Sequence, residues 1–348
     1  MMTEKNSARI DFMKFVCAVM VVAIHCRWPW GEPWNPTWIA NQTLFLRGVT
    51  RIAVPFFFVC SGYFIARHLT SLSAWRSAVY KRIKTIVVPF FIWTMIEILF
   101  FPLVVAFFGD IVLGRPVCST PCAFLRSYDW IYPFEKLFWK TPIAPLWYLR
   151  CLFIFVLIAP AIIFLIRRRG KTYLMFCFLL GIFYHLLPGH NINMLLGFNF
   201  SLPGLFYFSL GIWLFNHPLP IFGGGGQCFA VAALLFSVKM ILSSKGWHVG
   251  ALMAEELSIP FLLYATWRMI PAVRLPRWLA NSFFPIYLMH MCAIWSLDSL
   301  IPRVPSLVNA PCVCALIRLF VGVFGSIAGA NILRRLLPNV ARVVFGER

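Results

Sequence analysis

Long apolar stretches alternate with short polar segments along almost the whole chain. A helix of about 20 apolar residues crosses the hydrocarbon core of a bilayer, so the pattern predicts an all-α polytopic membrane protein with about ten transmembrane helices. The predicted spans lie at about residues 10–27, 47–66, 84–108, 146–166, 172–187, 203–215, 226–243, 252–270, 279–298 and 311–333.

Basic residues give this arrangement an orientation, because cytoplasmic connections carry an excess of Lys and Arg. If the N-terminus is cytoplasmic, more than half of the 31 basic residues fall at the cytoplasmic ends of the predicted helices, and only the cytoplasmic connection 216–225 lacks them. The sequence therefore predicts that both termini are cytoplasmic. No segment has the composition of a soluble module, so we expect a single transmembrane domain over residues 1–348.

The composition supports a membrane protein and gives no sign of a nucleic-acid partner. Charged residues make up 12% of the chain, against about 25% in soluble domains. The net charge of +20 comes from clusters between apolar segments rather than from one basic face. Most of the eleven cysteines lie in apolar segments, whereas Cys118 and Cys122 lie in a polar loop and would pair if it faces an oxidising compartment. No metal site is expected.

The first predicted helix carries two ionisable residues on one face. Lys14 and His25 are eleven residues apart, which in an α-helix is about three turns and a rise of about 16 Å. An ionisable group at this depth is costly and usually faces a polar interior. Roles without a functional site stay open for this helix: a signal anchor, a Lys14 side chain that snorkels to the surface, and a His25 ring at the outer interface.

Arg51 opens the second predicted helix near the expected outer level of His25. An arginine in an apolar setting needs a partner, which favours a functional site. Ser61 and Gly62 lie deeper in the same helix. Small residues let helices approach closely, so the sequence leaves a packing role and a functional role open for both.

A basic group, Lys81, Arg82 and Lys84, precedes the third predicted helix on its cytoplasmic side. Lys81 and Lys84 are neighbours on a helix surface, and with Arg82 they would bind phosphate groups. A topology signal or contact with anionic lipids would account for the same residues. Lys14 is expected at the same membrane face, which favours a shared ligand that carries phosphates.

Other ionisable residues in or near the spans have open roles. Glu97 lies in the middle of the third span and requires either a buried base or a proton, and His290 lies within the ninth span. Glu135 belongs to the long outer loop 109–145, whose carboxylates and aromatic residues would suit a sugar. Glu255 and Glu256 begin the eighth span and are expected to mark its outer interface.

Several of these segments together resemble the membrane acyltransferase family 3 in its stand-alone transmembrane form. The first-helix motif is Arg9-x-Asp11-x-x-Lys14 followed by His25, and the second-helix segment is Val54-Pro55-Phe56-Phe57-Phe58-x-x-Ser61-Gly62-Tyr63. Lys81-Arg82-Ile83-Lys84 is similar to the family's basic patch, with lysines in place of some arginines. Trp147-Tyr148-Leu149 and Ile286-Tyr287-Leu288-x-His290 also fit.

The resemblance implies transfer of an acyl group, most simply acetyl from acetyl-CoA, to a hydroxyl of a cell-surface carbohydrate or its lipid-linked precursor at a bacterial inner membrane. Lys14, Lys81, Arg82 and Lys84 would hold the phosphates of the donor. His25 would be the general base and Arg51 would stabilise the oxyanion or orient the sugar. Supporting or substrate-binding roles are expected for a second set: Asp11, Ser61, Glu97, Glu135 and His290.

Two alternative functions remain open. The charges within the membrane would also suit a glycan or lipid translocator that consumes no acyl-CoA. The enzyme could also use a succinyl rather than an acetyl donor, which the sequence does not decide.

Overall fold

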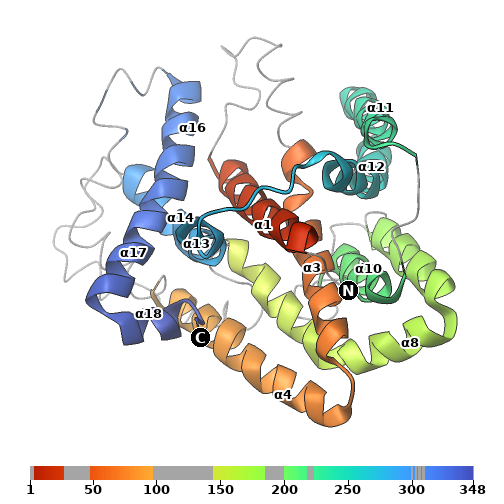
Figure 1. Ribbon diagram of the computed structural model, residues 1–348. Helices are drawn as coiled ribbons and strands as arrows, with labels where there is room; N and C mark the ends of the chain where they lie inside the picture. Colours follow the sequence, from red (N-terminus) through yellow and green to blue (C-terminus); the bar gives the residue numbers. More distant parts are fainter. Residues whose placement is uncertain are drawn as a thin grey trace, which may run out of the picture. The chain divides into compact units, whose positions relative to one another are not determined.

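The computed structural model describes residues 4–26, 48–96, 144–184, 200–217, 223–298, 301, 304, 307 and 310–347. These residues form helices and contain no strand, which confirms the predicted all-α class within the described ranges. In chain order (Figure 1) the elements are α1 (Glu4–Ile24), α3 (Ala53–His68), α4 (Leu72–Arg82), the π-helix η1 (Ile83–Val87), the 3-10 helix η2 (Ala144–Leu146), α8 (Trp147–Tyr184), α10 (Leu202–Asn216), α11 (Gly225–Ser244), α12 (His248–Met269), α13 (Arg277–Ala280), α14 (Phe283–Asp298), α16 (Pro311–Phe320), the π-helix η5 (Val321–Gly325), α17 (Ser326–Leu336) and α18 (Pro338–Val344).

The chain divides into two compact units. Unit 1 contains the described residues of Met1–Cys17, Phe45–Tyr80 and Cys151–Ala280, and unit 2 contains those of Ala18–Leu44, Lys81–Arg150 and Asn281–Arg348. Three of the boundaries fall inside the helices α1, α4 and α8. The two units are therefore described separately, and the single transmembrane domain remains a prediction.

Five helices of the described ranges are long and apolar enough to cross a membrane. They are Gly48–His68, Trp147–Tyr184, Gly225–Ser244, His248–Met269 and Cys312–Leu336, and a shorter apolar helix covers Leu202–Asn216. Each coincides with one or two of the predicted spans. The protein is thus a helical membrane protein, while the count of ten spans and the cytoplasmic location of both ends remain predictions.

The longest helix, α8, contains a break that the sequence predicts. Its 38 residues would extend about 57 Å as one straight helix, well beyond a bilayer core. Arg169 has the non-helical angles φ −145° and ψ 54°, and it lies between the predicted spans 146–166 and 172–187. The basic segment around Arg169 therefore separates two apolar helical halves.

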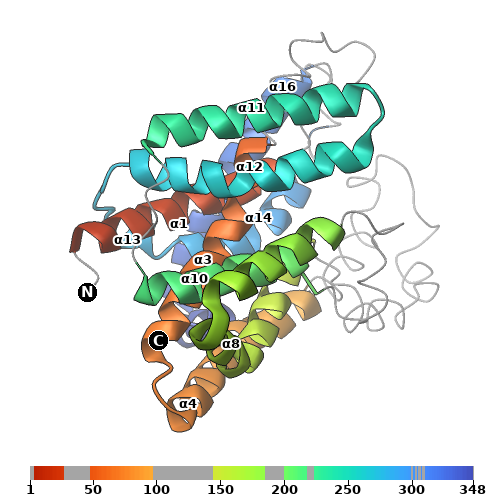
Figure 2. The same cartoon turned by 90° about the vertical axis from the view of Figure 1, so that its right-hand side faces the viewer.

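In unit 1, α3 and α10 pack with their backbones in close approach. A Cβ atom on Gly62 would lie 2.0 Å from the carbonyl oxygen of Phe208, and one on Gly211 would lie 2.0 Å from that of Val59. Only glycine fits at these two positions. In the same unit, α11 and α12 run side by side as an antiparallel pair (Figure 2).

In unit 2, the last residues of the described chain are held by a contact set that we call the C-terminal clasp (Val344–Glu347). The indole Nε1 of Trp93 donates a 3.1 Å hydrogen bond to the carbonyl of Val344, and Phe345 stacks on the same indole. Gly346 has φ +58°, and a Cβ atom there would lie 2.6 Å from the carbonyl oxygen of Thr85 in η1. The clasp therefore covers one side of the π-helix η1.

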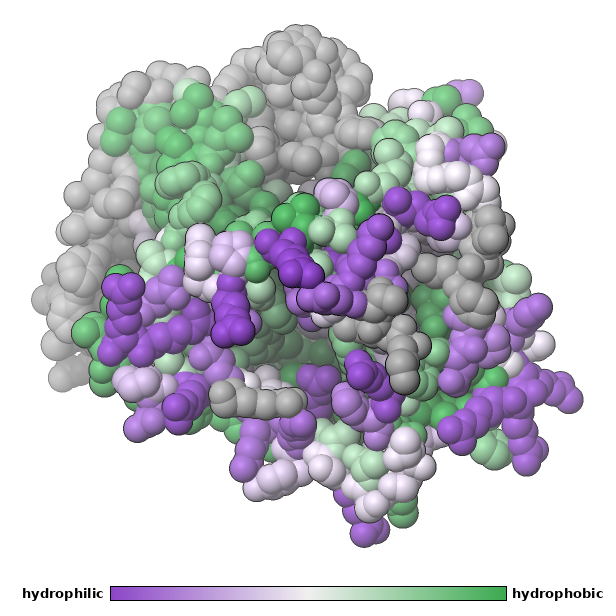
Figure 3. Space-filling view, viewed as in Figure 1, coloured by the Kyte–Doolittle hydropathy of each residue, from purple (hydrophilic) through white to green (hydrophobic). Residues whose placement is uncertain are grey.

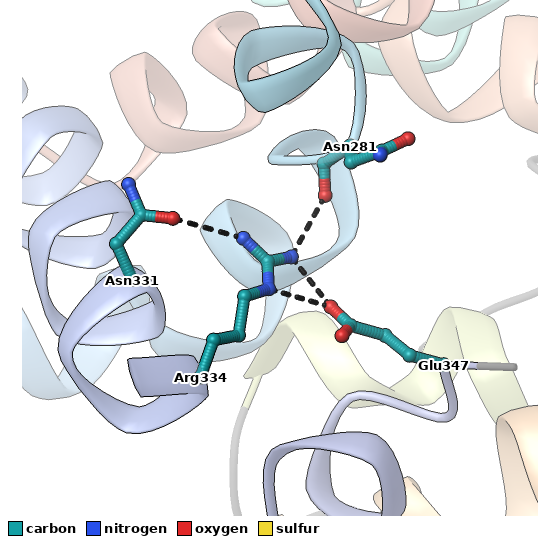
Figure 4. A network of polar contacts seen from close by, with 4 residues as sticks. All are labelled: Asn281, Asn331, Arg334 and Glu347. Carbon is teal, nitrogen blue, oxygen red and sulfur yellow. Dashed lines mark hydrogen bonds and ion pairs between the residues drawn. The ribbon is translucent and has the colours of Figure 1, made fainter. Parts of the chain in front are cut away.

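Arg334 joins the clasp to two other parts of unit 2 (Figure 4). Its Nε donates to Glu347 Oε1 at 2.9 Å, its Nη1 to Asn331 Oδ1 at 3.1 Å and its Nη2 to the carbonyl of Asn281 at 3.2 Å.

Helix α16, by contrast, presents large apolar side chains outward, with Leu316 56% and Phe320 62% exposed. Its surface is green in Figure 3, as expected for a helix that contacts lipid.

Candidate functional site

Two histidines from distant parts of the sequence meet in unit 2. His25 follows the last residue of α1, and its backbone N–H bonds to the carbonyl of Val22 at 3.0 Å. His290 lies on α14 and is fully buried. The centroids of the two imidazole rings are 5.4 Å apart, with an angle of 39° between the ring planes. The sequence nominates both residues, but only the fold shows that they are neighbours.

The hydrogen bond of His290 fixes its tautomer. Nδ1 lies 3.0 Å from the carbonyl oxygen of Ile286, one helical turn earlier. A carbonyl oxygen only accepts, so Nδ1 carries the proton and the neutral ring has its lone pair on Nε2. Nε2 is buried and has no hydrogen-bond partner within the described residues.

Aromatic side chains hold the first part of α14 in place. The hydroxyl of Tyr287 donates to the carbonyl of Pro145 in η2, and its ring lies 5.9 Å from that of Tyr148 at the start of α8. Phe284 stacks on Tyr287 with an angle of 7° between the rings. The two late segments that carry the sequence resemblance, around Tyr148 and Tyr287, are therefore in direct contact.

The end of α1 packs against α14 and η5 on another side. A Cβ atom on Gly322 would lie 2.6 Å from Val22 Cγ1 and 3.4 Å from Ile294 Cγ1. One turn beyond Ile294, Asp298 Oδ1 lies 2.6 Å from the Nε of Arg318. This partly buried ion pair is absent from the predicted site. The sequence does contain a signal for this pair, because Asp298 and Arg318 each place a charge within a predicted span.

In unit 1, Lys14 is paired at the N-terminal half of α1. Its ammonium group lies 3.2 Å from Asp11 Oδ1, one turn earlier, and 5.3 Å from the centroid of the Phe64 ring. Helix α1 is confirmed through Lys14 to Ile24. The acid of the first-helix motif thus orients the lysine of the same motif.

Arg51 lies in the turn before α3 and forms an ion pair, as the sequence predicts for an arginine in an apolar setting. Its Nε is 2.7 Å from Glu255 Oε1, and the Nζ of Lys239 is 2.6 Å from Glu255 Oε2. Glu255 and Glu256 are only 3% and 9% exposed, so both are buried in unit 1, and their expected location at the outer membrane interface stays a prediction. Both side chains face the interior of unit 1. Glu255 forms ion pairs there with cations from two other segments, the turn before α3 and helix α11.

The remaining candidates are placed only in part. Lys81 and Lys84 are exposed on α4 and η1, with Arg82 half-buried between them. These residues belong to unit 2 and Lys14 to unit 1, so their shared ligand remains a prediction. Ser61 is half-buried on α3, next to the close approach at Gly62. A last group lies outside the described residues: Glu97, Cys118, Cys122 and Glu135.

Comparison with known proteins gives one family match and two relatives of different extent. Residues 7–334 match a family model described as an acyltransferase domain. Over its whole length the chain is 24% identical to the succinoglycan biosynthesis protein ExoH of Rhizobium meliloti, covering 94% of that protein. A segment of 77 residues is 36% identical to a serine/alanine racemase of Enterococcus gallinarum, covering 22% of this chain and 10% of that protein. No solved structure matches.

Proposed function

The chain belongs to the acyltransferase 3 family, and we propose that it moves an acyl group, in the simplest case acetyl, from cytoplasmic acyl-CoA to a hydroxyl of a cell-surface carbohydrate or its lipid-linked precursor. The name of the relative ExoH, a succinoglycan biosynthesis protein, supports a carbohydrate acceptor. The apolar helices support action at a membrane, which we propose is the bacterial inner membrane.

The pairing of His25 with His290 is the observation that carries this proposal. Acyl transfer needs a base that removes the proton of the acceptor hydroxyl while its oxygen attacks the thioester carbonyl. We assign this role to His25, because its ring is half-buried at the end of α1 and an imidazole gains and loses protons near neutral pH. The C–S bond then breaks and the leaving thiolate of CoA takes up the proton from His25.

We assign basic side chains to two places, the phosphates of CoA and the site of acyl transfer. Lys81, Arg82 and Lys84 would hold the phosphates of CoA, with Lys14 as a further cation. Arg51 would stabilise the oxyanion or orient the sugar: a guanidinium has five N–H donors, so the ion pair through Nε leaves donors on the terminal nitrogens. Supporting or substrate-binding roles are proposed for a second set: Asp11, Ser61, Glu97, Glu135 and His290.

The test is acyl transfer by the purified protein in detergent, with acetyl-CoA and succinyl-CoA offered in parallel. We expect saturable turnover by the wild type, loss of turnover with retained donor binding in His25→Ala, and weaker donor binding in Lys84→Ala. Lys245→Ala is the matched control, because Lys245 is an exposed lysine after α11, far along the chain from the basic patch. The donor that turns over faster identifies the acyl group.

Two results would contradict the assignment. Full activity in His25→Ala would remove the general base. No binding of any acyl-CoA would instead favour a glycan or lipid translocator, for which the buried charges around Glu255 would line the path.

A further inference from the structure

We propose that His290 is a positioning residue for His25: it accepts a hydrogen bond from the His25 ring and thereby fixes which of the two His25 nitrogens takes up a proton. This inference rests on the proposed function, because it assigns the reactive tautomer of the base. It rests structurally on four features of unit 2: the proximity of the rings, the fixed tautomer of His290, the burial of its Nε2 and the rigid support of α14.

The tautomer of His290 makes its ring a one-sided acceptor. Nδ1–H is committed to the carbonyl of Ile286, and the ring is fully buried. Only Nε2 remains to interact with another group, and it can only accept a hydrogen bond while the ring is neutral. A buried polar atom without a partner is rare in native proteins and needs a specific physical reason.

His25 supplies the donor that accounts for Nε2. In either neutral tautomer one nitrogen of its ring carries a proton, and both do after it has accepted one. With the ring centroids 5.4 Å apart, the two facing nitrogens meet either after a rotation of the His25 ring or through one bridging water. The N–H that bonds to His290 leaves the other nitrogen of His25 with its lone pair.

The two rings are held differently, which decides their roles. His290 belongs to a helix fixed by the bond from Tyr287 to Pro145 and by the stacking of Phe284. His25 follows the last residue of α1, where the helix has ended and the ring is half-buried. The fixed, fully buried ring is the orienting partner, and the more accessible ring is the group that reacts.

The arrangement matches the logic of a nucleophile–base–orienter series, in which the third group holds the base in one tautomer and itself exchanges no proton. Here a neutral imidazole occupies the place that a carboxylate often holds. The other ionisable groups described around the pair are Tyr287 on α14, Tyr148 on α8, Cys26 beside His25, and the Asp298–Arg318 ion pair. The charge of Asp298 is compensated by Arg318, so among the described residues we assign His290 Nε2, whose ring is the one next to His25, as the acceptor for His25.

The experiment uses the full-length protein with His290→Phe, which keeps a ring without an acceptor, and His290→Gln, whose amide oxygen can accept near the position of Nε2. Leu288→Met is the control, because it is a volume-conserving change of a buried residue on the same helix. Two readouts are needed: kcat and KM as functions of pH, and the rate at which diethyl pyrocarbonate modifies His25, followed by mass spectrometry.

We expect His290→Phe to lower kcat by about 100-fold or more with KM for the donor nearly unchanged. It should also change the pH dependence of His25 modification. His290→Gln should recover most of both properties, and Leu288→Met should match the wild type.

The results separate this inference from the proposed function. If His290→Phe keeps the wild-type pH profile and modification rate, or if His290→Gln is as impaired as His290→Phe, His290 has only a packing role and the inference fails while the acyltransferase proposal stands. If the wild type transfers no acyl group but His25 modification still depends on the acceptor at position 290, the proposed function fails and the pairing stands.

Discussion

At the scale of single residues, the carboxylate of Glu255 in unit 1 lies between two cations. Its two oxygens lie 2.7 Å from Arg51 Nε and 2.6 Å from Lys239 Nζ. Lys239 also lies 4.8 Å from the Phe236 ring centroid. A buried charge is tolerated only with such compensation, so this cluster ties α11 and the turn before α3 to α12.

Glu255→Gln should destabilise the protein more than Lys239→Met. The first change leaves a buried ammonium group without its counter-charge, at a cost of roughly 3 kcal/mol, whereas after the second the carboxylate keeps Arg51. The double variant Glu255→Gln/Lys239→Met should recover part of the loss, because the charge left without a partner is then Arg51, whose side chain is 40% exposed, and not the more deeply placed ammonium group. Apparent unfolding temperatures in detergent, read by tryptophan fluorescence, check this order, and equal losses in both single variants would contradict it.

At the scale of helices, the contact between α3 and α10 depends on two glycines. The Cβ positions of Gly62 and Gly211 are each 2.0 Å from a backbone carbonyl oxygen of the other helix. A backbone atom cannot move aside as a flexible side chain can, so any larger residue must separate the helices. Apolar side chains of unit 1 near this contact, including Phe58, Phe155 and Phe208, are packed as a ring cluster.

Gly62→Val and Gly211→Val should therefore reduce the yield of monodisperse protein sharply and lower its apparent unfolding temperature, because overpacking against fixed backbone costs several kcal/mol. Gly226→Ala is the control: a Cβ atom there meets nothing within 4 Å, and alanine favours the helix. The measurement is size-exclusion chromatography in detergent. Wild-type behaviour of both valine variants would show that the helices separate without cost.

Helix location was predictable from the sequence because it depends on local patterns of apolar residues, whereas the roles of the candidate site residues stay predictions. Apolar length predicts α3, α10, α11 and α12, and the basic segment predicts the break of α8 at Arg169. The partners were not predictable. His25 and His290, or Arg51 and Glu255, lie far apart in the chain, and only the packing of helices decides which charges meet.

At the scale of the whole molecule, the predicted orientation can be tested on one helix. The predicted topology places Lys245, before α12, outside and Arg277, after it, in the cytoplasm. Both residues are exposed. If α12 spans the membrane, Lys245→Cys should react with a membrane-impermeant thiol reagent in intact cells, above the level of the unmodified protein.

Arg277→Cys should react with the same reagent only after the cells are permeabilised. Labelling of both positions from outside would contradict the predicted ten-span topology, whereas the reverse pattern would invert it. Seven of the described native cysteines are buried and two are intermediate in exposure. Cys118 and Cys122, which are predicted in an outer loop, contribute the background that the unmodified protein measures.

The C-terminal clasp has a consequence for how the protein is made. Trp93 and Val344, which it joins, are 251 residues apart in the chain. At a synthesis rate of about 5–20 residues per second, Trp93 waits on the order of 10–50 s for its partner to leave the ribosome. During that interval the side of η1 that Gly346 later covers lacks this contact. The helix that carries Lys84 therefore lacks this support until α18 and the residues after it have been translated.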